Sequence, residues 1–328
     1  MKKNYFITGG TGSFGQKFIE LLIKKKLAKK IIVFSRDEFK QLKLKEKEFV
    51  NKNIKIFRFY IGDVRDKSRL DWAMHDDIDV VIHSAALKQV PTTEYNPFET
   101  VKTNVIGTQN LVETCIKKNI DKTLLVSTDK AVSPINLYGA TKLTAEKLII
   151  SANIFKGRRK CKFSVVRYGN VMGSRGSVIP LLLSQNLNKK IPFTITDKRM
   201  TRFNITLDDA SDLVLNCLKQ MRGKEVFIPK LPSYNITTLA KSINPNKKIK
   251  IIGIRKGEKL HEELISAGDF QNCKTFKNFF IIYPLGDKTI NNKIYSFASS
   301  YNSYENKKYL NSKELKSLIQ KQLKNFEK

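Results

Sequence analysis

Two short segments carry side chains whose types and spacing could perform proton and hydride chemistry. Tyr138 and Lys142 lie four residues apart, so one helical turn would place both on the same helix face. A lysine cation beside a phenol, together with an oxidised cofactor, favours the phenolate, which can take a hydroxyl proton while hydride leaves the same carbon. The segment Ser127-Thr128-Asp129-Lys130 lies upstream and adds an adjacent acid and base. Together these residues indicate an enzyme that oxidises its substrate, eliminates water from it and reduces it again.

The elements that must position these residues follow an alternating pattern. Short apolar runs are separated by longer amphipathic stretches, which is typical of βαβ units in a parallel sheet. The sequence therefore predicts an α/β protein with a Rossmann-type, doubly wound parallel sheet. The predicted strands are residues 5–8, 31–34, 54–57, 80–83, 123–126 and 163–166.

The regular alternation ends after Tyr168, where glycines and prolines become frequent. We expect residues 1–168 to form a dinucleotide-binding domain, to which residues 205–228 return with a helix and a strand. A smaller, discontinuous substrate-binding lobe is expected from residues 169–204 and 229–328, over the carboxyl ends of the strands. The sequence from Lys307 onward predicts one amphipathic helix that serves in packing within the protein or in assembly of subunits.

A glycine-rich turn follows the first predicted strand and opens the first helix. Glycines permit a tight turn, close approach of backbone N–H groups to a pyrophosphate, and close packing of helix on strand. The helix N-terminus adds partial positive charge. The predicted cradle comprises Gly9, Thr11, Gly12, Ser13, Phe14 and Gly15.

The end of the second predicted strand indicates which dinucleotide is bound. An acidic residue there usually accepts from a free ribose 2′-hydroxyl, but Ser35, Arg36 and Lys40 could instead hold a 2′-phosphate. NADP is therefore favoured, while Asp37 leaves NAD open. Further predicted cofactor contacts after the third and fourth strands are Asp63, Val64, Ala85 and Ala86.

Composition excludes several classes of protein. No apolar run is long enough for a membrane span, and the N-terminus lacks the pattern of a secretory signal, so a cytoplasmic location is expected. The four cysteines are scattered without metal-site spacing, which predicts reduced structural thiols and no metal. The net charge of +31 could attract nucleic acid, but no recognition motif accompanies the dispersed lysines. A regulator that binds nucleic acid without turnover remains an alternative.

Several segments together resemble the extended short-chain dehydrogenase/reductases and, among them, the inverting UDP-N-acetylglucosamine 4,6-dehydratases of pseudaminic acid synthesis. The resemblance covers residues 6 to about 285 and departs at Lys256, where proline is expected. Beyond the cradle and the segment from Ser127 to Lys142, it depends on residues 35–38, 86–91, 167–177, 199–203 and 255–262. A homo-oligomer is implied as well.

The resemblance implies roles for the reactive residues. Tyr138, assisted by Lys142 and Thr128, removes the C4 hydroxyl proton as hydride passes to NADP⁺. Lys130, expected to be neutral because burial beside other cations lowers its pKa, takes the C5 proton, and a protonated Asp129 releases the C6 hydroxyl as water. Return of the hydride to C6, with protonation of C5 from the opposite face, inverts that centre.

The substrate implied is UDP-N-acetylglucosamine. A retaining UDP-sugar 4,6-dehydratase and a UDP-sugar C4/C5 epimerase remain the enzymatic alternatives. His83 and His261 are assigned no catalytic role. The residues expected to contact the substrate are Lys88, also a cofactor contact, with Asn170, Val171, Arg175, Gly176, Ser177, Thr201, Arg202, Arg255 and Glu258.

Overall fold

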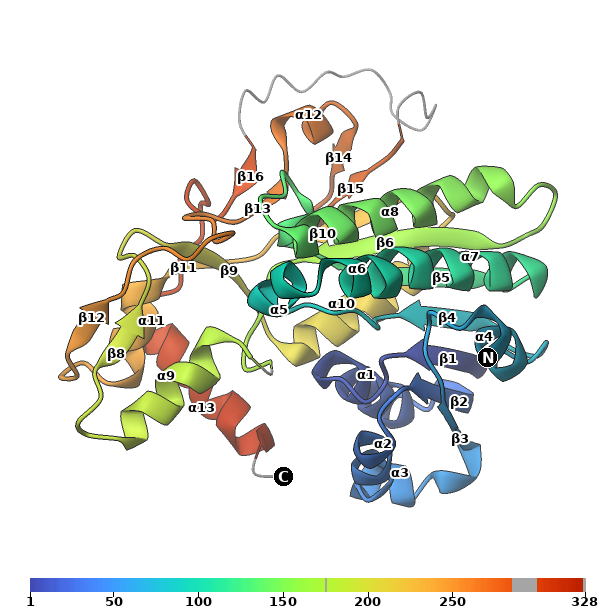
Figure 1. Cartoon of the computed structure of the whole chain (residues 1–328), viewed down its shortest axis with the longest axis horizontal. Helices are drawn as coiled ribbons and strands as arrows, with labels where there is room; N and C mark the ends of the chain where they lie inside the picture. Colours follow the sequence, from blue (N-terminus) through green and yellow to red (C-terminus); the bar gives the residue numbers. More distant parts are fainter. Residues whose placement is uncertain (175, 285–299, 327–328) are drawn as a thin grey trace.

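A nine-stranded sheet forms the centre of the protein, as seen in a computed structural model that describes residues 1–174, 176–284 and 300–326 (Figure 1). The strand order is β14-β15-β10-β6-β5-β4-β1-β2-β3. The seven strands from β3 to β10 run parallel, whereas β15 and β14 are antiparallel to their neighbours. This order confirms the predicted doubly wound α/β sheet. The strands are β1 (Lys3–Thr8), β2 (Ala28–Ser35), β3 (Phe57–Ile61), β4 (Val80–His83), β5 (Lys122–Thr128), β6 (Lys162–Tyr168), β10 (Val226–Pro229), β14 (Cys273–Thr275) and β15 (Phe279–Ile282).

Helices pack on both faces of this sheet. On one face α1 packs against α10 and α3, and on the other α7 lies between α4 and α8. Apolar side chains of β1, β2, β4 and β6 are fully buried between these layers, which explains why the parallel strands read as continuous apolar runs. The helices are α1 (Ser13–Lys24), α2 (Glu38–Lys45), α3 (Glu48–Asn51), α4 (Lys67–Ala73), α5 (Val90–Tyr95), α6 (Pro97–Val101), the π-helical η2 (Lys102–Ile106), α7 (Gly107–Lys117), α8 (Leu137–Phe155) and α10 (Leu207–Gln220).

A second, smaller apolar core holds the lobe on the left in Figure 1. Its buried side chains come from α9, α11 and α13 and from the short strands beside them. Two small sheets, β11-β9-β7 and β12-β8, complete this region. The β13-β16 pair and α12 lie nearer the large sheet, where Leu264 and Ile265 join the main core (Figure 1). The elements are β7 (Asn170–Val171), α9 (Val178–Leu187), β8 (Phe193–Ile195), β9 (Thr201–Ile205), β11 (Ser233–Asn235), α11 (Ile236–Ile243), β12 (Ile249–Ile251), β13 (Glu263–Ile265), α12 (Ala267–Phe270), β16 (Tyr301–Asn302) and α13 (Ser312–Phe326).

Two predicted elements are wrong in their boundaries. The apolar run at residues 54–57 is mostly a 3-10 turn, η1 (Ile54–Ile56), and strand β3 begins only at Phe57 because its backbone pairs with β2 from Ile31 onward. The tail helix begins at Ser312 rather than near Lys307. Leu310 N–H donates to the Ser233 carbonyl, and Asn311 and Glu314 form a reciprocal cap that starts α13.

The domain boundaries also differ in one respect from those expected. Residues 229–328 include β14 and β15, which extend the large sheet beyond β10 instead of joining the smaller lobe. Their pairing explains this placement: the Val226–Pro229 segment of β10 is the free edge of the parallel sheet, and β15 covers it in antiparallel register.

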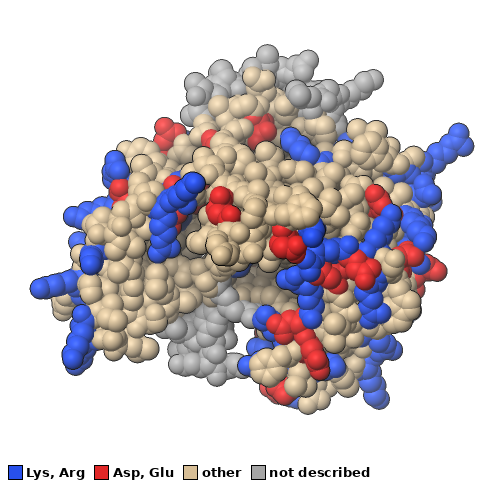
Figure 2. Space-filling view, in the orientation of Figure 1, with Lys and Arg blue, Asp and Glu red and all other residues tan. Residues whose placement is uncertain are grey.

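The surface in Figure 2 carries Lys and Arg side chains over both lobes, interleaved with Asp and Glu rather than gathered into one basic stripe. All four cysteines are free and buried, which confirms the prediction of structural thiols. Within the described ranges, no helix has the length and apolarity to cross a membrane.

Candidate active site

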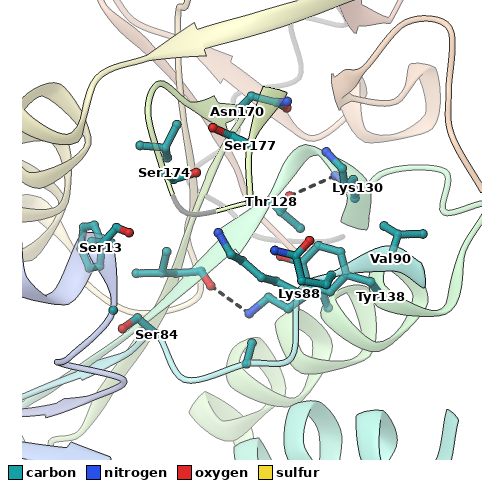
Figure 3. A pocket seen from close by; sticks show the side chains of 18 of the residues that line it. Ser13, Ser84, Lys88, Val90, Thr128, Lys130, Tyr138, Asn170, Ser174 and Ser177 are labelled. Carbon is teal, nitrogen blue, oxygen red and sulfur yellow. Dashed lines mark hydrogen bonds between the residues drawn. The ribbon is translucent and has the colours of Figure 1, made fainter. Parts of the chain in front are cut away.

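A cavity of about 1090 Å³ contains nearly all the predicted site residues. It runs along the carboxyl ends of the parallel strands and continues into the smaller lobe. In Figure 3, Lys88 enters it from the segment after β4, Thr128, Lys130 and Tyr138 surround it, and Asn170 and Ser177 lie across from them. The fold thus brings together groups that are far apart in the sequence.

The glycine-rich turn at one end of the cavity has the shape of an anion cradle. Gly9 has a φ of +68°, and a Cβ there would lie 2.9 Å from the Ala85 backbone nitrogen. At Gly15 a Cβ would lie 2.6 Å from Gly10 Cα. Gly12 is the N-cap of helix α1, which has no side-chain cap and no acidic residue in its first turn, so its first N–H groups can donate hydrogen bonds to an anion. The cradle fits a dinucleotide pyrophosphate.

The residues after β2 lie beside this cradle and line the cavity. Asp37 caps α2 by accepting from the Lys40 backbone N–H at 2.9 Å and also pairs with the Lys40 ammonium. The Arg36 guanidinium is half exposed, with one nitrogen 3.4 Å from the Asp63 carboxylate. The Asp63 carboxylate accepts three hydrogen bonds from Arg65. A ribose phosphate could therefore meet Arg36 and Lys40 here.

Helix α8 positions the Tyr138 and Lys142 pair. The Asn136 side chain caps it by accepting from the Gly139 N–H at 2.8 Å. Tyr138 and Lys142 are both buried on the face toward the sheet, and Lys142 donates to the Val126 carbonyl at 2.8 Å. Burial raises the pKa of Tyr138 to about 12, against the opposing effects of Lys130 and of a hydrogen bond with Thr128. Burial likewise lowers the pKa of Lys142 to about 8, against the opposing charge of Glu146.

The acid and base pair lies in the 3-10 turn η3 (Asp129–Ala131), which follows β5 directly. Asp129 Oδ1 accepts from Thr128 Oγ1 at 3.0 Å and from Lys130 Nζ at 3.1 Å. Asp129 Oδ2 is buried without a hydrogen-bond partner among the described residues. Burial raises the pKa of Asp129, as predicted, although Lys130 opposes the shift. An unpartnered carboxyl oxygen in this place suits an acid that can donate a proton.

The expectation that Lys130 is neutral in the protein is wrong. Burial disfavours its ammonium, but the carboxylates of Asp129 and Glu262 outweigh this effect and raise the pKa of Lys130 above its ordinary value. The nearest carboxylate oxygen of Glu262 is 3.2 Å from Lys130 Nζ. The expectation rested on neighbouring cations, but the carboxylates of Asp129 and Glu262 both contact Lys130 Nζ.

Among the substrate candidates, Lys88, Asn170, Val171, Gly176, Ser177, Arg202, Arg255 and Glu258 line the cavity. Thr201 does not line it: its hydroxyl is buried between His261 Nδ1 at 2.8 Å and Ser303 Oγ at 2.7 Å. Arg175 lies outside the described residues.

Neither His83 nor His261 is expected to act in catalysis, and His261 contacts the Thr201 hydroxyl. His83 is buried between the Thr8 and Thr108 hydroxyls. Burial, with a contribution from Lys142, lowers the pKa of His83 to about 3.

Three residues of the cavity wall were assigned no role from the sequence. Glu262 faces Lys130, Lys259 donates to the Val132 carbonyl at 2.6 Å, and Gln89 packs against Gly176. Glu262 ends the charged segment 255–262 and directly precedes strand β13. The position of the Glu262 carboxylate directly before a buried strand is the sequence feature that could have indicated its role.

Known proteins similar to this chain include dehydratases and epimerases of nucleotide sugars. A protein of Campylobacter jejuni subsp. jejuni (serotype O:23/36, strain 81-176) named UDP-N-acetylglucosamine 4,6-dehydratase (inverting) is 46% identical, and the match covers 97% of each chain. A protein of Rickettsia bellii (strain OSU 85-389) named UDP-glucose 4-epimerase is 40% identical over 98% of each chain. The X-ray structure of Pen from Bacillus thuringiensis superposes with a TM-score of 0.88, at 39% identity and 98% coverage of each chain.

The resemblance to inverting dehydratases is thus confirmed by a relative that matches almost end to end. The sequence model of the family described as "Polysaccharide biosynthesis protein" matches residues 5–284. Since this match spans most of the chain, the protein belongs to the polysaccharide biosynthesis protein family.

Proposed function

We propose that the protein is an inverting UDP-N-acetylglucosamine 4,6-dehydratase that forms UDP-2-acetamido-2,6-dideoxy-β-L-arabino-hex-4-ulose. The observation that carries this proposal is the Asp129 and Lys130 pair, which shares one cavity with Tyr138 and a dinucleotide cradle. Oxidation alone needs only Tyr138 and Lys142, whereas elimination of water needs an additional acid and base. The name of the Campylobacter jejuni relative supports the same activity.

Tyr138 would remove the proton of the C4 hydroxyl, with Thr128 orienting that hydroxyl. The cradle from Gly9 to Gly15 would hold NADP⁺, whose chemistry would be reversible uptake of the hydride that moves from C4 to C6. The raised pKa of Tyr138 means that formation of the phenolate needs further positive charge near the phenol. Lys130 already acts in this direction, and the nicotinamide cation would add to it.

The acid and base pair would then eliminate water. A proton moving from Lys130 Nζ to Asp129 along their 3.1 Å hydrogen bond produces a neutral amine and a carboxylic acid. The amine removes the C5 proton, which the C4 ketone has made acidic, and Asp129 gives its proton to the departing C6 hydroxyl. A proton derived from solvent, added to C5 on the face opposite Lys130, completes the inversion.

The remaining wall of the cavity would hold the nucleotide and sugar. Arg202 and Arg255 supply guanidinium groups for the diphosphate, and Glu258 supplies an acceptor for the ribose or base. Arg255 and Glu258 both line the cavity, and their closest charged atoms lie 3.9 Å apart.

NADP, rather than NAD, is proposed because Arg36 and Lys40 can contact a 2′-phosphate while the Asp37 carboxylate caps α2. A role in pseudaminic acid synthesis and a homo-oligomeric state belong to the same proposal and rest on the resemblance. A cytoplasmic location is proposed from the sequence pattern described above. The face seen in Figure 2 carries no basic stripe that would support binding to nucleic acid.

An epimerase is the second candidate, because the Rickettsia bellii relative carries that name. Both candidates are tested by NMR of the purified protein with UDP-N-acetylglucosamine in D₂O. A C6 methyl signal, deuterium at C5 and the L-arabino configuration are expected. Retained C5 configuration would indicate a retaining dehydratase, and a C4 epimer without a 6-deoxy product would contradict the proposal in favour of the epimerase.

A further inference from the structure

The carboxylate of Glu262 lines the cavity and lies against the acid and base pair. Its Oε1 atom is 3.2 Å from Lys130 Nζ and 3.6 Å from Arg202 Nε. The side chain is only 4% exposed, and its Oε2 atom has no hydrogen-bond partner among the described residues. Lys130 Nζ thus contacts two carboxylates, since Asp129 Oδ1 is 3.1 Å away.

The backbone that carries Glu262 is fixed on both sides. Its N–H donates to Ser303 Oγ at 2.9 Å, and its carbonyl accepts from the Ser303 N–H at 2.7 Å. The Ser303 hydroxyl in turn contacts Thr201 Oγ1 at 2.7 Å. Glu262 therefore approaches Lys130 from the residue directly before the β13-β16 pair, where two hydrogen bonds to Ser303 hold its backbone. Lys130 itself belongs to the turn after β5.

The charges in this cluster balance in a particular way. With Asp129 and Glu262 ionised and Lys130 and Arg202 protonated, the four groups sum to zero. Moving one proton from Lys130 to Asp129 leaves that sum unchanged, and Glu262 still neutralises Arg202 in the product form. Without Glu262 the cluster would carry one net positive charge in both forms, which favours loss of the shared proton in a buried site.

We infer that Glu262 is a positioning residue: it holds the Lys130 amine beside Asp129 and keeps the proton that these two residues share within the pair. The cluster faces charged or titratable groups from several elements, and these are Asp129 and Lys130 of η3, Tyr138 of α8, Arg202 of β9, Tyr234 of β11 and Lys259 before β13. Burial raises the pKa of Glu262, but Lys130 and Arg202 outweigh it, so the net shift of the pKa is downward and Glu262 stays ionised.

Glu262→Gln should change the pKa values of the pair in a defined direction. Loss of the carboxylate removes an anion that favours protonation of both Lys130 and Asp129. Both macroscopic pKa values of the pair should therefore fall, by about 1 to 3 pH units. A variant that only loosened the packing would lower the rate at every pH without moving either value.

The first measurement reads Lys130 directly and does not depend on turnover. The rate at which acetic anhydride acetylates Lys130, followed by mass spectrometry from pH 7 upward in the full-length protein, gives the onset of the free amine. We expect onset at lower pH in Glu262→Gln, and onset near the wild-type pH in Glu262→Asp. The matched control is Glu263→Gln, which removes the neighbouring carboxylate that accepts from Ser133 Oγ at 2.8 Å and should leave the onset unchanged.

The second measurement is the pH profile of 6-deoxy product formation. The role of the pair in elimination rests on the proposed function, and both limbs of the profile should move to lower pH in Glu262→Gln. An unchanged acetylation onset would overturn the inference, whatever the activity. An earlier onset in an enzyme whose wild type forms no 6-deoxy product would support the inference and contradict the proposed function. If Glu262→Gln fails to fold, Ser303→Ala, which removes one of the two hydrogen bonds that hold the Glu262 backbone, should give a smaller shift in the same direction, and no shift would overturn the inference.

Discussion

Replacement of Gly139 by alanine should inactivate the enzyme even though it places a better helix former inside α8. Gly139 directly follows Tyr138, and the backbone of Lys130 passes against it. A Cβ at this position would overlap the Lys130 carbonyl oxygen. It would also lie 3.0 Å from the Lys130 carbonyl carbon and 3.1 Å from Pro134 Cβ. The close approach of helix and turn that sets the distance from Tyr138 to Lys130 therefore depends on a missing side chain.

The size of the effect follows from two opposing terms. Alanine gains about 1 kcal/mol over glycine inside a helix, whereas an added methyl group in a packed site costs about 1–3 kcal/mol. The net loss of unfolding free energy should thus be no more than about 2 kcal/mol, and the variant should fold. Ordinary contact distances of 3.4–4 Å can be restored only if the η3 turn moves away from α8. A displacement of about 1 Å between reacting groups lowers a rate by about 100-fold.

The assay compares formation of the 6-deoxy product and thermal unfolding in Gly139→Ala and in Gly268→Ala. Gly268 also lies in a helix, but a Cβ there would meet nothing within 4 Å, so activity and stability should be unchanged or slightly improved. A Gly139→Ala enzyme that retained activity within about two-fold of wild type would refute the claim that this contact positions Lys130. A melting temperature equal to wild type with the expected loss of activity would instead mean that the turn shifts at little energetic cost.

Three further predictions test other parts of the site. Lys130→Ala should abolish deuterium incorporation at C5 and formation of the 6-deoxy product while NADP still binds, and normal turnover would remove Lys130 from the role of base. Arg36→Ala should weaken NADP by roughly 10- to 100-fold and NAD much less, measured by calorimetry, because one charged hydrogen-bonding group is lost; equal losses would show that Arg36 does not contact the 2′-phosphate. The lowered pKa of Lys142, about 8 against 10.5, means that the unfolded chain binds more protons between these values, so this residue makes folding more favourable as the pH rises through that window. Between pH 8 and pH 10 this gain is on the order of 2 kcal/mol. Lys142→Met should remove it in urea unfolding of the cofactor-free protein, and an equal change in unfolding free energy between the two pH values in both proteins would contradict the prediction.

The features that could be predicted from sequence are those set by local geometry. The parallel sheet followed from alternating apolar and amphipathic runs, and the cradle from glycines at fixed positions between strand and helix. The misplaced third strand shows the limit of this reasoning: residues 54–57 are apolar enough for a strand, but pairing with β2 begins at Phe57. Pairing of β14 and β15 with the edge at β10 was equally hidden, because nothing in those short segments specifies a partner.

The same division runs through the active site. The sequence by itself determined that Tyr138 and Lys142 share a helix face and that Asp129 and Lys130 are adjacent, since both relations are fixed by covalent spacing. Only the tertiary structure decided the charge on Lys130, because Glu262 reaches it from the segment before β13, far along the chain. It also decided that Thr201 supports the wall of the cavity instead of lining it. Electrostatic interactions depend on distance in space, and the sequence specifies such distances only between residues that are close along the chain.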